Sequence, residues 1–343
     1  MLWKILRTLV LTGLMALLLV SCANRNTAFY EDDILQFLVR IPVVGNPLDL
    51  DMDETNLYVA ADQGGFSIID LSNYSIKWYT ALGSGDGTIT DFVLIRKIAT
   101  VRSQNRMFVN ETFGSDLIRI VNMENMDSLK LMDAISGASQ DVQDMLFFEN
   151  PDQGSVFTIF GAYCSGYGFR LGRYHGPLSL WHGNILEIDA PASISGFAIT
   201  DDYIVLACEQ RGLMIYSRNN GSYISEISLP GEAKKVSIKN NHAYVACRQQ
   251  GLQVVDISDV NHPIRIGGFD TVGYATSVDL MDDLVAVSSG SGGVYLFDIS
   301  NPATPRLSNR LTTAGYTNLA SFHEDKLIVA GRDTGISIYK IEK

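Results

Sequence analysis

Glycines recur at a fixed spacing in the C-terminal third of the chain. Two sets of three glycines each repeat every 42 residues, and the second set follows the first by 20: Gly231, Gly273, Gly315, then Gly251, Gly293, Gly335. Such regular spacing indicates one supersecondary unit that is copied around or along a shared core. The repeat therefore constrains the fold more than any other feature of the sequence.

One copy of the unit, beginning at Gly231, contains four short apolar runs separated by turn residues. The runs are 235–238, 242–246, 252–258 and 264–269, and none has helical periodicity, so they predict four antiparallel strands. A four-stranded unit of this length is typical of a propeller blade. The same pattern places third strands near residues 65, 116, 168, 212, 251, 293 and 335, which predicts seven blades.

The two ends of the chain supply complementary parts of one unit. The last unit stops after its third strand, whereas 37–45 resembles an isolated fourth strand, and Gly45 precedes Gly65 by the same 20 residues. We expect these parts to form one blade that closes the ring and leaves no open edge. The alternative, an open solenoid, needs polar capping units, and the sequence has none. The predicted fold is all-β, a seven-bladed β-propeller of four-stranded antiparallel blades over residues 35–343.

Three of the predicted third strands share a motif. They are Phe66-Ser-Ile-Ile-Asp-Leu-Ser-Asn, Leu252-Gln-Val-Val-Asp-Ile-Ser and Val294-Tyr-Leu-Phe-Asp-Ile-Ser-Asn-Pro. These segments resemble the LVIVD repeat of a bacterial seven-bladed propeller family, which is found largely in secreted and surface proteins. The motif is degenerate elsewhere, since Ser217 and Lys340 replace its Asp in blades four and seven. The resemblance implies the fold and no settled activity.

The first 22 residues predict export. Lys4 and Arg7 precede an apolar run at 9–20 that is short for a membrane span, as in a signal peptide over residues 1–21. The run ends in Leu-Val-Ser-Cys, which resembles the bacterial lipobox and implies lipidation of Cys22, with 22–34 as a polar tether. The expected location is the bacterial envelope, and Ala23 after the cysteine favours the outer membrane. The alternative is an uncleaved anchor helix, which also tethers the chain to a membrane.

The chain is acidic, and its acids gather in turns. Loss of residues 1–21 removes two basic residues and no acidic one, which takes the net charge from −12 to −14 and disfavours nucleic acid as a partner. Acidic pairs occupy the predicted turns between first and second strands, all on one face: Asp53-Glu54, Asp201-Asp202, Asp282-Asp283 and Glu324-Asp325. Asp is common in exposed turns; a site for a cation or a basic partner is the alternative. Without an Asp-x-Asp-x-Asp-Gly loop, no metal or cofactor is expected.

Three cysteines occupy equivalent positions in consecutive blades. Cys164, Cys208 and Cys247 each lie four residues before their third-strand position, where the other blades have small residues, namely Ala61, Thr112, Ser289 and Gly331. Equivalent points in adjacent blades are roughly 9 Å apart, beyond the ~7 Å limit for a disulfide. We therefore expect three buried free thiols; a zinc site, the alternative, needs a fourth ligand.

The loops on the face opposite the acidic turns carry the candidate binding residues. They are Tyr167, Glu209, Arg211, Arg248 and Arg332. Arginines in such an acidic chain suggest a pocket for an anion or carboxylate near the channel mouth. The alternative is that each arginine is solvated or paired with a neighbour such as Glu209. Blades two and three are longer and more aromatic, which favours a partner-binding surface or simply extra core there.

The sequence has no catalytic motif. It lacks a Gly-x-Ser-x-Gly elbow, a His-Glu-x-x-His pair and a phosphate-binding Gly loop followed by Lys, and its five histidines are scattered. The leading hypothesis is a monomeric binding or scaffold module for a protein or glycan partner. A second is a structural component of an envelope assembly complex, by analogy with the propeller lipoprotein of outer-membrane protein insertion. A third is a hydrolase or lyase with its site in the channel.

Overall fold

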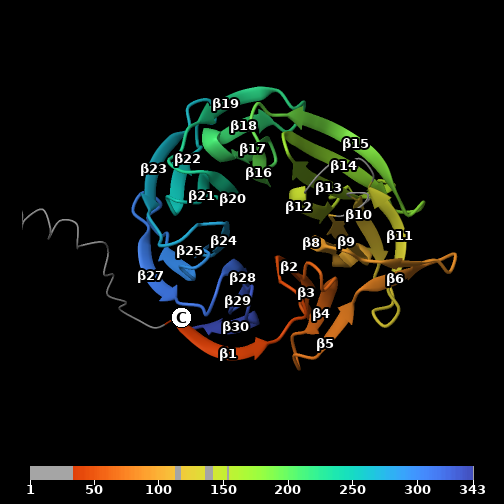
Figure 1. Ribbon diagram of the computed structural model, residues 1–343. Coiled ribbons are helices and arrows are strands. Elements are labelled where there is room, and N and C mark those ends of the chain that lie inside the picture. Colours follow the sequence, from red (N-terminus) through yellow and green to blue (C-terminus); the bar gives the residue numbers. More distant parts are fainter. Residues whose placement is uncertain (1–33, 113–116, 136–141, 153, 343) are drawn as a thin grey trace, which may run out of the picture. The chain divides into compact units, whose positions relative to one another are not determined.

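The computed structural model describes residues 34–112, 117–135, 142–152 and 154–342. These residues form seven sheets of mainly antiparallel strands around a central axis, which confirms the predicted all-β propeller (Figure 1). The predicted signal peptide, Cys22 and the tether up to residue 33 lie outside the described residues. Helical structure in the described part is limited to the 3-10 turns η1 (Arg102–Gln104) and η2 (Glu209–Arg211), so no helix there has the length and hydropathy of a membrane span.

In each blade the first strand lies nearest the axis and the later strands follow outward. Blades one to three are β2 (Asp49–Met52), β3 (Asn56–Ala60), β4 (Phe66–Asp70) and β5 (Ile76–Tyr79); β8 (Ile95–Val101), β9 (Arg106–Glu111), β10 (Leu117–Asn122) and β11 (Lys130–Ile135); and β12 (Val142–Glu149), β13 (Phe157–Ser165), β14 (Gly168–His175) and β15 (Leu180–Asp189). Blades four to six are β16 (Ile194–Ile199), β17 (Tyr203–Cys208), β18 (Gly212–Ser217) and β19 (Tyr223–Ile227); β20 (Ala233–Lys239), β21 (His242–Cys247), β22 (Leu252–Asp256) and β23 (Ile264–Phe269); and β24 (Ser277–Met281), β25 (Leu284–Ser288), β26 (Val294–Asp298) and β27 (Arg306–Leu311). Every predicted third-strand position falls within one residue of the start of a third strand.

Blade seven joins the two ends of the chain, as predicted. It contains β28 (Thr317–His323), β29 (Lys326–Gly331) and β30 (Gly335–Ile341), and its outer strand is β1 (Leu35–Ile41). β1 runs antiparallel to β30, with Leu35 opposite Ile341 and Ile41 opposite Ile336. The strand begins two residues before the predicted segment, and Ile41 is only 4% exposed. The ring is therefore closed by one N-terminal and three C-terminal strands.

The repeated glycines have left-handed backbone conformations and close backbone neighbours. Gly293, just before β26, has φ +84°, and a Cβ there would lie 2.1 Å from the Leu311 carbonyl oxygen at the end of β27. Gly273, between blades five and six, has φ +93°, and its Cβ would lie 2.2 Å from the Ser289 carbonyl oxygen. At both positions the left-handed φ and the close carbonyl oxygen each exclude a side chain. The spacing in the sequence thus marks the points where the backbones of adjoining loops meet.

Apolar side chains fill the space between neighbouring blades. One buried cluster contains Tyr244 and Val254 of blade five together with Val278, Val285 and Phe297 of blade six. The second and third strands are covered by other blades on both sides. This explains why their sequences are continuous apolar runs instead of alternating apolar and polar residues.

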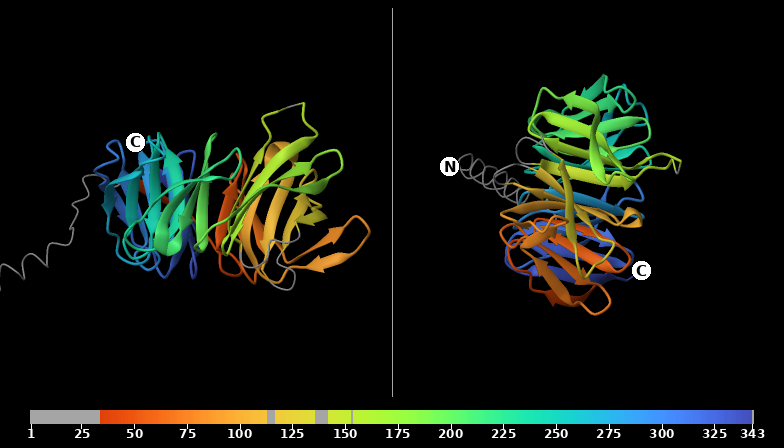
Figure 2. Two further views of the ribbon diagram at one scale, coloured as in Figure 1. Left: turned by 90° about the horizontal axis from the view of Figure 1, so that it is seen from above. Right: turned by 90° about the vertical axis from the view of Figure 1, so that its right-hand side faces the viewer.

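The extra length of blades two and three has two different causes. The connection into blade two contains a hairpin, β6 (Ala81–Ser84) and β7 (Ile89–Asp91), which adds two strands to the four predicted because β6 pairs in parallel with β11. Blade three has longer strands that project beyond the ring (Figure 2). Its aromatic residues Tyr163, Phe169 and Tyr174 are buried, so part of the added sequence is core.

The ring has two faces, which differ in the loops they carry. The turn face carries the loops between first and second strands and between third and fourth strands. The crossover face carries the loops between second and third strands and the connections between blades. The described chain begins at the turn face, because Leu35 lies opposite Ile341 and the Glu342 N–H donates to the Ile34 carbonyl at 2.9 Å.

Candidate functional site

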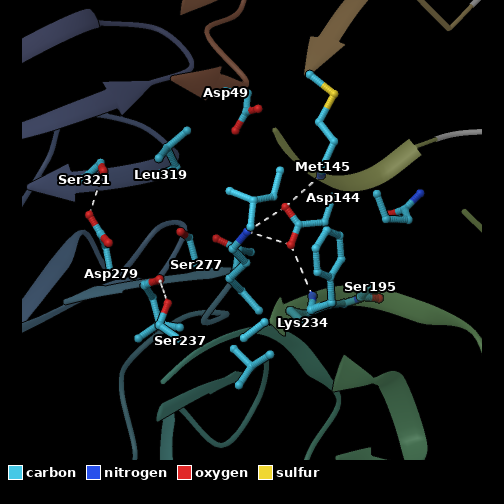
Figure 3. A pocket seen from close by; sticks show the side chains of 18 of the residues that line it. Asp49, Asp144, Met145, Ser195, Lys234, Ser237, Ser277, Asp279, Leu319 and Ser321 are labelled. Atoms are coloured by element: carbon cyan, nitrogen blue, oxygen red, sulfur yellow. Dashed lines mark hydrogen bonds and ion pairs between the residues drawn. The ribbon is translucent and has the colours of Figure 1, made fainter. Parts of the chain in front are cut away.

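The first strands line a central cavity of about 550 Å³ (Figure 3). Six charged residues from five blades line this cavity: Asp49, Lys97, Asp144, Lys234, Lys235 and Asp279. Asp279 of blade six and the hydroxyls of Ser237 and Ser321 lie nearer the turn face. The channel is therefore a charged, polar cavity within an apolar ring.

An ion pair crosses part of this channel. The Lys235 ammonium lies 2.6 Å from both carboxylate oxygens of Asp144, and these residues belong to blades five and three, so the pair bridges over blade four. Blade four has Gly196 on its first strand, where a Cβ would lie 2.5 Å from the Lys234 carbonyl oxygen. The missing side chain lets β20 approach closely. Burial alone would lower the pKa of Lys235, but the Asp144 carboxylate outweighs it and raises that pKa.

Carboxylates of the first strands also bind the backbone of the following blade. Asp49 accepts the Ile98 N–H at 3.1 Å, Asp144 accepts the Phe197 N–H at 3.2 Å, and Asp279 accepts the Phe322 N–H at 2.8 Å. Each of these bonds joins two consecutive first strands. These acids therefore hold neighbouring blades together around the axis.

Asp49 lines the channel with its side chain only 21% exposed. Burial raises its pKa, and the nearest ammonium, that of Lys97, is 3.7 Å away. Burial likewise raises the pKa of Asp51, whose carboxylate accepts hydrogen bonds from the Thr100 hydroxyl and N–H. The channel carboxylates are thus engaged mainly with backbone and lysine groups. Across the described ranges no three His, Cys, Asp or Glu side chains are grouped as metal ligands.

The structure places the predicted arginines in separate environments. Arg211 pairs with Glu226 at 2.6 Å and lines a groove of about 500 Å³ between blades three and four. Arg248 pairs with Glu232 at 2.7 Å, and its guanidinium lies 5.2 Å from the ring centre of Tyr274. Arg332 lies in the same way 4.6 Å from the ring centre of Tyr316. Among the described contacts none joins two of these three arginines.

The other two predicted residues also differ in their surroundings. Glu209 accepts hydrogen bonds from the Lys234 ammonium at 2.7 Å and the Ser195 hydroxyl at 3.1 Å, and both donors line the cavity. Tyr167, in the loop between β13 and β14, is 62% exposed. Glu209 thus belongs to the channel mouth, whereas Tyr167 belongs to the open surface of the crossover face.

Exposed apolar side chains recur on the crossover face. Val44, Val93, Val272 and Tyr274 lie in connections between blades, and with Tyr167 they are 48–63% exposed. These positions come from several blades. The crossover face therefore presents an apolar and aromatic surface, with the guanidinium of Arg248 stacked on one of its rings. We call these five residues the crossover surface.

The acidic turns lie on the turn face as expected, and each has a basic partner. The pairs are Asp53 with Arg102, Asp201 with Arg218, Asp283 with Lys239, and Asp325 with Lys326, at 2.7–3.9 Å. Pairing of this kind accords with the interpretation of these acids as turn residues. It leaves less net negative charge on this face than the sequence suggests.

The three cysteines are buried and free, which confirms that expectation. Burial raises the pKa of the Cys208 and Cys247 thiols to about 12 and raises that of Cys164 well above its ordinary value. A thiol with so high a pKa contains almost no thiolate near neutral pH and reacts slowly. These cysteines therefore act as small packing residues at the ends of β13, β17 and β21.

Comparison with known proteins agrees with the fold. The LVIVD repeat model matches residues 45–76, 230–271 and 272–313, which cover blades one, five and six, the same blades whose third strands carry the motif. The structure of U3-55K is similar with a TM-score of 0.68 at 13% identity, over 89% of this chain and 98% of that one. The computationally designed Ika8 protein gives 0.61 at 12% identity, over 89% and 100%. Identities this low show the fold alone, and no curated protein matched the chain.

Proposed function

We propose that this seven-bladed propeller, which carries LVIVD repeats in three blades, is an exported, lipid-anchored module that binds a protein or glycan partner on its crossover face. The observation that carries the proposal is the crossover surface of Val44, Val93, Tyr167, Val272 and Tyr274, in which every side chain is about half exposed or more. Tyrosine is enriched in binding sites because it supplies a large contact area with few rotatable bonds.

The surroundings of Tyr274 favour recognition. The Arg248 guanidinium is held between the Glu232 carboxylate and the Tyr274 ring, so both planar groups are already ordered. Ordered side chains lose less conformational entropy when a partner binds. Stacked aromatic and guanidinium groups suit the planar side chains of a protein and the flat faces of sugar rings. The channel acids, by contrast, are used to join the blades.

A photo-crosslinking amino acid at Tyr274 is expected to capture the partner in the native envelope. The control carries the same group at Tyr223, which is 53% exposed on the outer strand β19 and is therefore equally accessible. We expect a discrete adduct from Tyr274 and none from Tyr223, and digestion with protease or glycosidase then identifies the class of partner. Equal adducts from both positions, or none from either, would contradict the proposed binding face.

Substitution of Cys22 is expected to release the chain from the membrane. In the wild type, mass spectrometry of the N-terminal peptide should find acyl chains on Cys22, and the protein should sediment with membranes. Cys22→Ser removes the acceptor thiol and should lose both properties, whereas Asn26→Ser in the tether should keep them. Several acyl chains hold a protein on a bilayer nearly permanently. An unmodified Cys22 in the wild-type protein would refute the anchor.

A further inference from the structure

Blade three ends in an apolar projection on the turn face. Its strands extend past those of the other blades there (Figure 2), and the exposed residues at its end include Asp152 and the apolar Val156 between β12 and β13, and Pro177, Leu178 and Leu180 around the turn between β14 and β15. Leu178 is 61% exposed, Val156 is 48% and Leu180 is 37%. We call the four apolar residues the blade-three tip.

The blade-three tip differs from the other turns of the same face. The turn between β14 and β15 is Gly-Pro-Leu-Ser; the corresponding turns of blades one and six, at 71–75 and 299–305, are also uncharged but expose no large apolar side chain. Blade five exposes the single Ile264 at the start of β23, whereas blade three groups three exposed aliphatic side chains. Water-exposed aliphatic side chains grouped on a projecting turn are unfavourable unless something apolar covers them.

The base of the tip is firmly packed. The Arg173 guanidinium lies 3.8 Å from the ring centre of Phe157, and the rings of His182 and His175 lie 4.9 and 5.4 Å from the same ring. The Leu178 N–H donates to Nδ1 of His175 at 3.1 Å, which fixes the turn. The apolar side chains are thus held outward on a rigid support.

The turn face is also where the N-terminal segment joins the propeller. Ile34 lies beside the C-terminal end of β30 on this face. Cys22 precedes Ile34 by 12 residues, so a fully extended tether spans about 40 Å. A lipid on Cys22 therefore keeps the turn face within that distance of the bilayer.

We infer that the blade-three tip inserts into the lipid surface that holds the N-terminal anchor. This inference rests on the proposed lipid anchor. The tip and the anchor give the propeller two attachment points, and a membrane-attached chain needs little extra affinity to keep a few aliphatic side chains in the interface. With the tip in lipid, the turn face is directed toward the membrane and the crossover surface is directed away from it, toward a partner. Since the tip is uncharged apart from its base, the contact is expected to resist salt.

The test places a polarity-sensitive fluorophore on the full, lipidated chain in vesicles of zwitterionic phospholipid. Leu178→Cys supplies the labelling site at the tip, and Val272→Cys, equally exposed on the crossover face, supplies the matched control. Cys164, Cys208 and Cys247 are buried, and in the lipidated chain the Cys22 thiol carries the lipid, so none of them competes for the label. We expect a blue shift and strong quenching by brominated lipid for the probe at Leu178, neither for the probe at Val272, and little change in high salt.

A second variant excludes insertion driven by the dye itself. With the probe moved to Val156→Cys, the change Leu178→Asp is expected to abolish quenching, while Val272→Asp leaves it intact. Vesicle flotation separates the two proposals. A chain that does not float with vesicles overturns the anchor and this inference with it, whereas a chain that floats with an unquenched probe at Leu178 overturns only the inference. Equal quenching at Leu178 and Val272 also overturns it.

Discussion

Removal of β1, residues Leu35–Ile41, is expected to turn a stable propeller into a protein that unfolds at much lower temperature and aggregates. β1 contributes six registered pairs with β30 and covers apolar side chains of blade seven, among them Ile338 and Ile341. Without it, the whole edge of β30 is open to pairing with other molecules. The apolar burial lost is worth several kcal/mol, at roughly 1.5–3 kcal/mol for each fully buried aliphatic side chain. Thermal unfolding and sedimentation velocity measure the two effects.

Point variants of β1 separate closure from simple shortening of the chain. Ile41 is buried at 4% exposure, so Ile41→Asp places an unpaired carboxylate in the seam and should cost on the order of 4 kcal/mol or more. Leu38, on the same strand, is 38% exposed, and Leu38→Asp should change stability by no more than about 0.5 kcal/mol. A melting temperature unaffected by deletion of β1, or equal effects of the two variants, would contradict closure by this strand.

Lys235→Met is expected to destabilise the propeller by about 3 kcal/mol. The substitution leaves Asp144, whose side chain is 6% exposed, without the Lys235 ammonium, and an abandoned buried charge costs about 3–5 kcal/mol. We expect the lower end of this energy range because the Lys235 side chain is 35% exposed and water can reach the site. The raised pKa of Lys235 means that its contribution is complete at neutral pH and is lost only as the pH rises through that value. Urea unfolding at neutral pH measures the loss.

Lys239→Met is the matched control for this effect. Lys239 lies on the same strand and pairs with Asp283, whose side chain is 73% exposed, so its loss should cost at most about 1 kcal/mol. Asp144→Asn combined with Lys235→Met should recover part of the stability, because the amide oxygen still accepts the Phe197 N–H without a charge. If Lys235→Met costs no more than Lys239→Met, the cross-channel pair does not hold the blades.

The sequence predicted the architecture well because the repeat carries backbone information. The glycines at 42-residue intervals mark places where a Cβ would meet a carbonyl oxygen, as at Gly273 and Gly293, so their spacing reports the blade period directly. The equivalent positions of Cys164, Cys208 and Cys247 predicted buried thiols because the other blades have small residues at the same position. Each is a local constraint that recurs in several blades.

The channel was less predictable because its interactions join residues from different blades. Asp144 and Lys235 are 91 residues apart, and only the ring geometry and the space above Gly196 bring them together. The available signal was the presence of charged residues on the first strands, which applies also to Lys97 and Asp279. The hairpin of β6 and β7 was hidden likewise, because its parallel pairing with β11 follows no repeat.

The position of β1 sets the order in which the molecule is completed. Among the described strands β1 is synthesised before all others and its partner, β30, after all others; Arg40 contacts Ser337, which lies 297 residues later in the chain. β1 must therefore wait unpaired until all the other blades exist, and contacts between such distant segments form slowly. During that interval the edges of β1 and β30 are unpaired and can pair with strands of other molecules. The chain therefore needs a chaperone most at this stage.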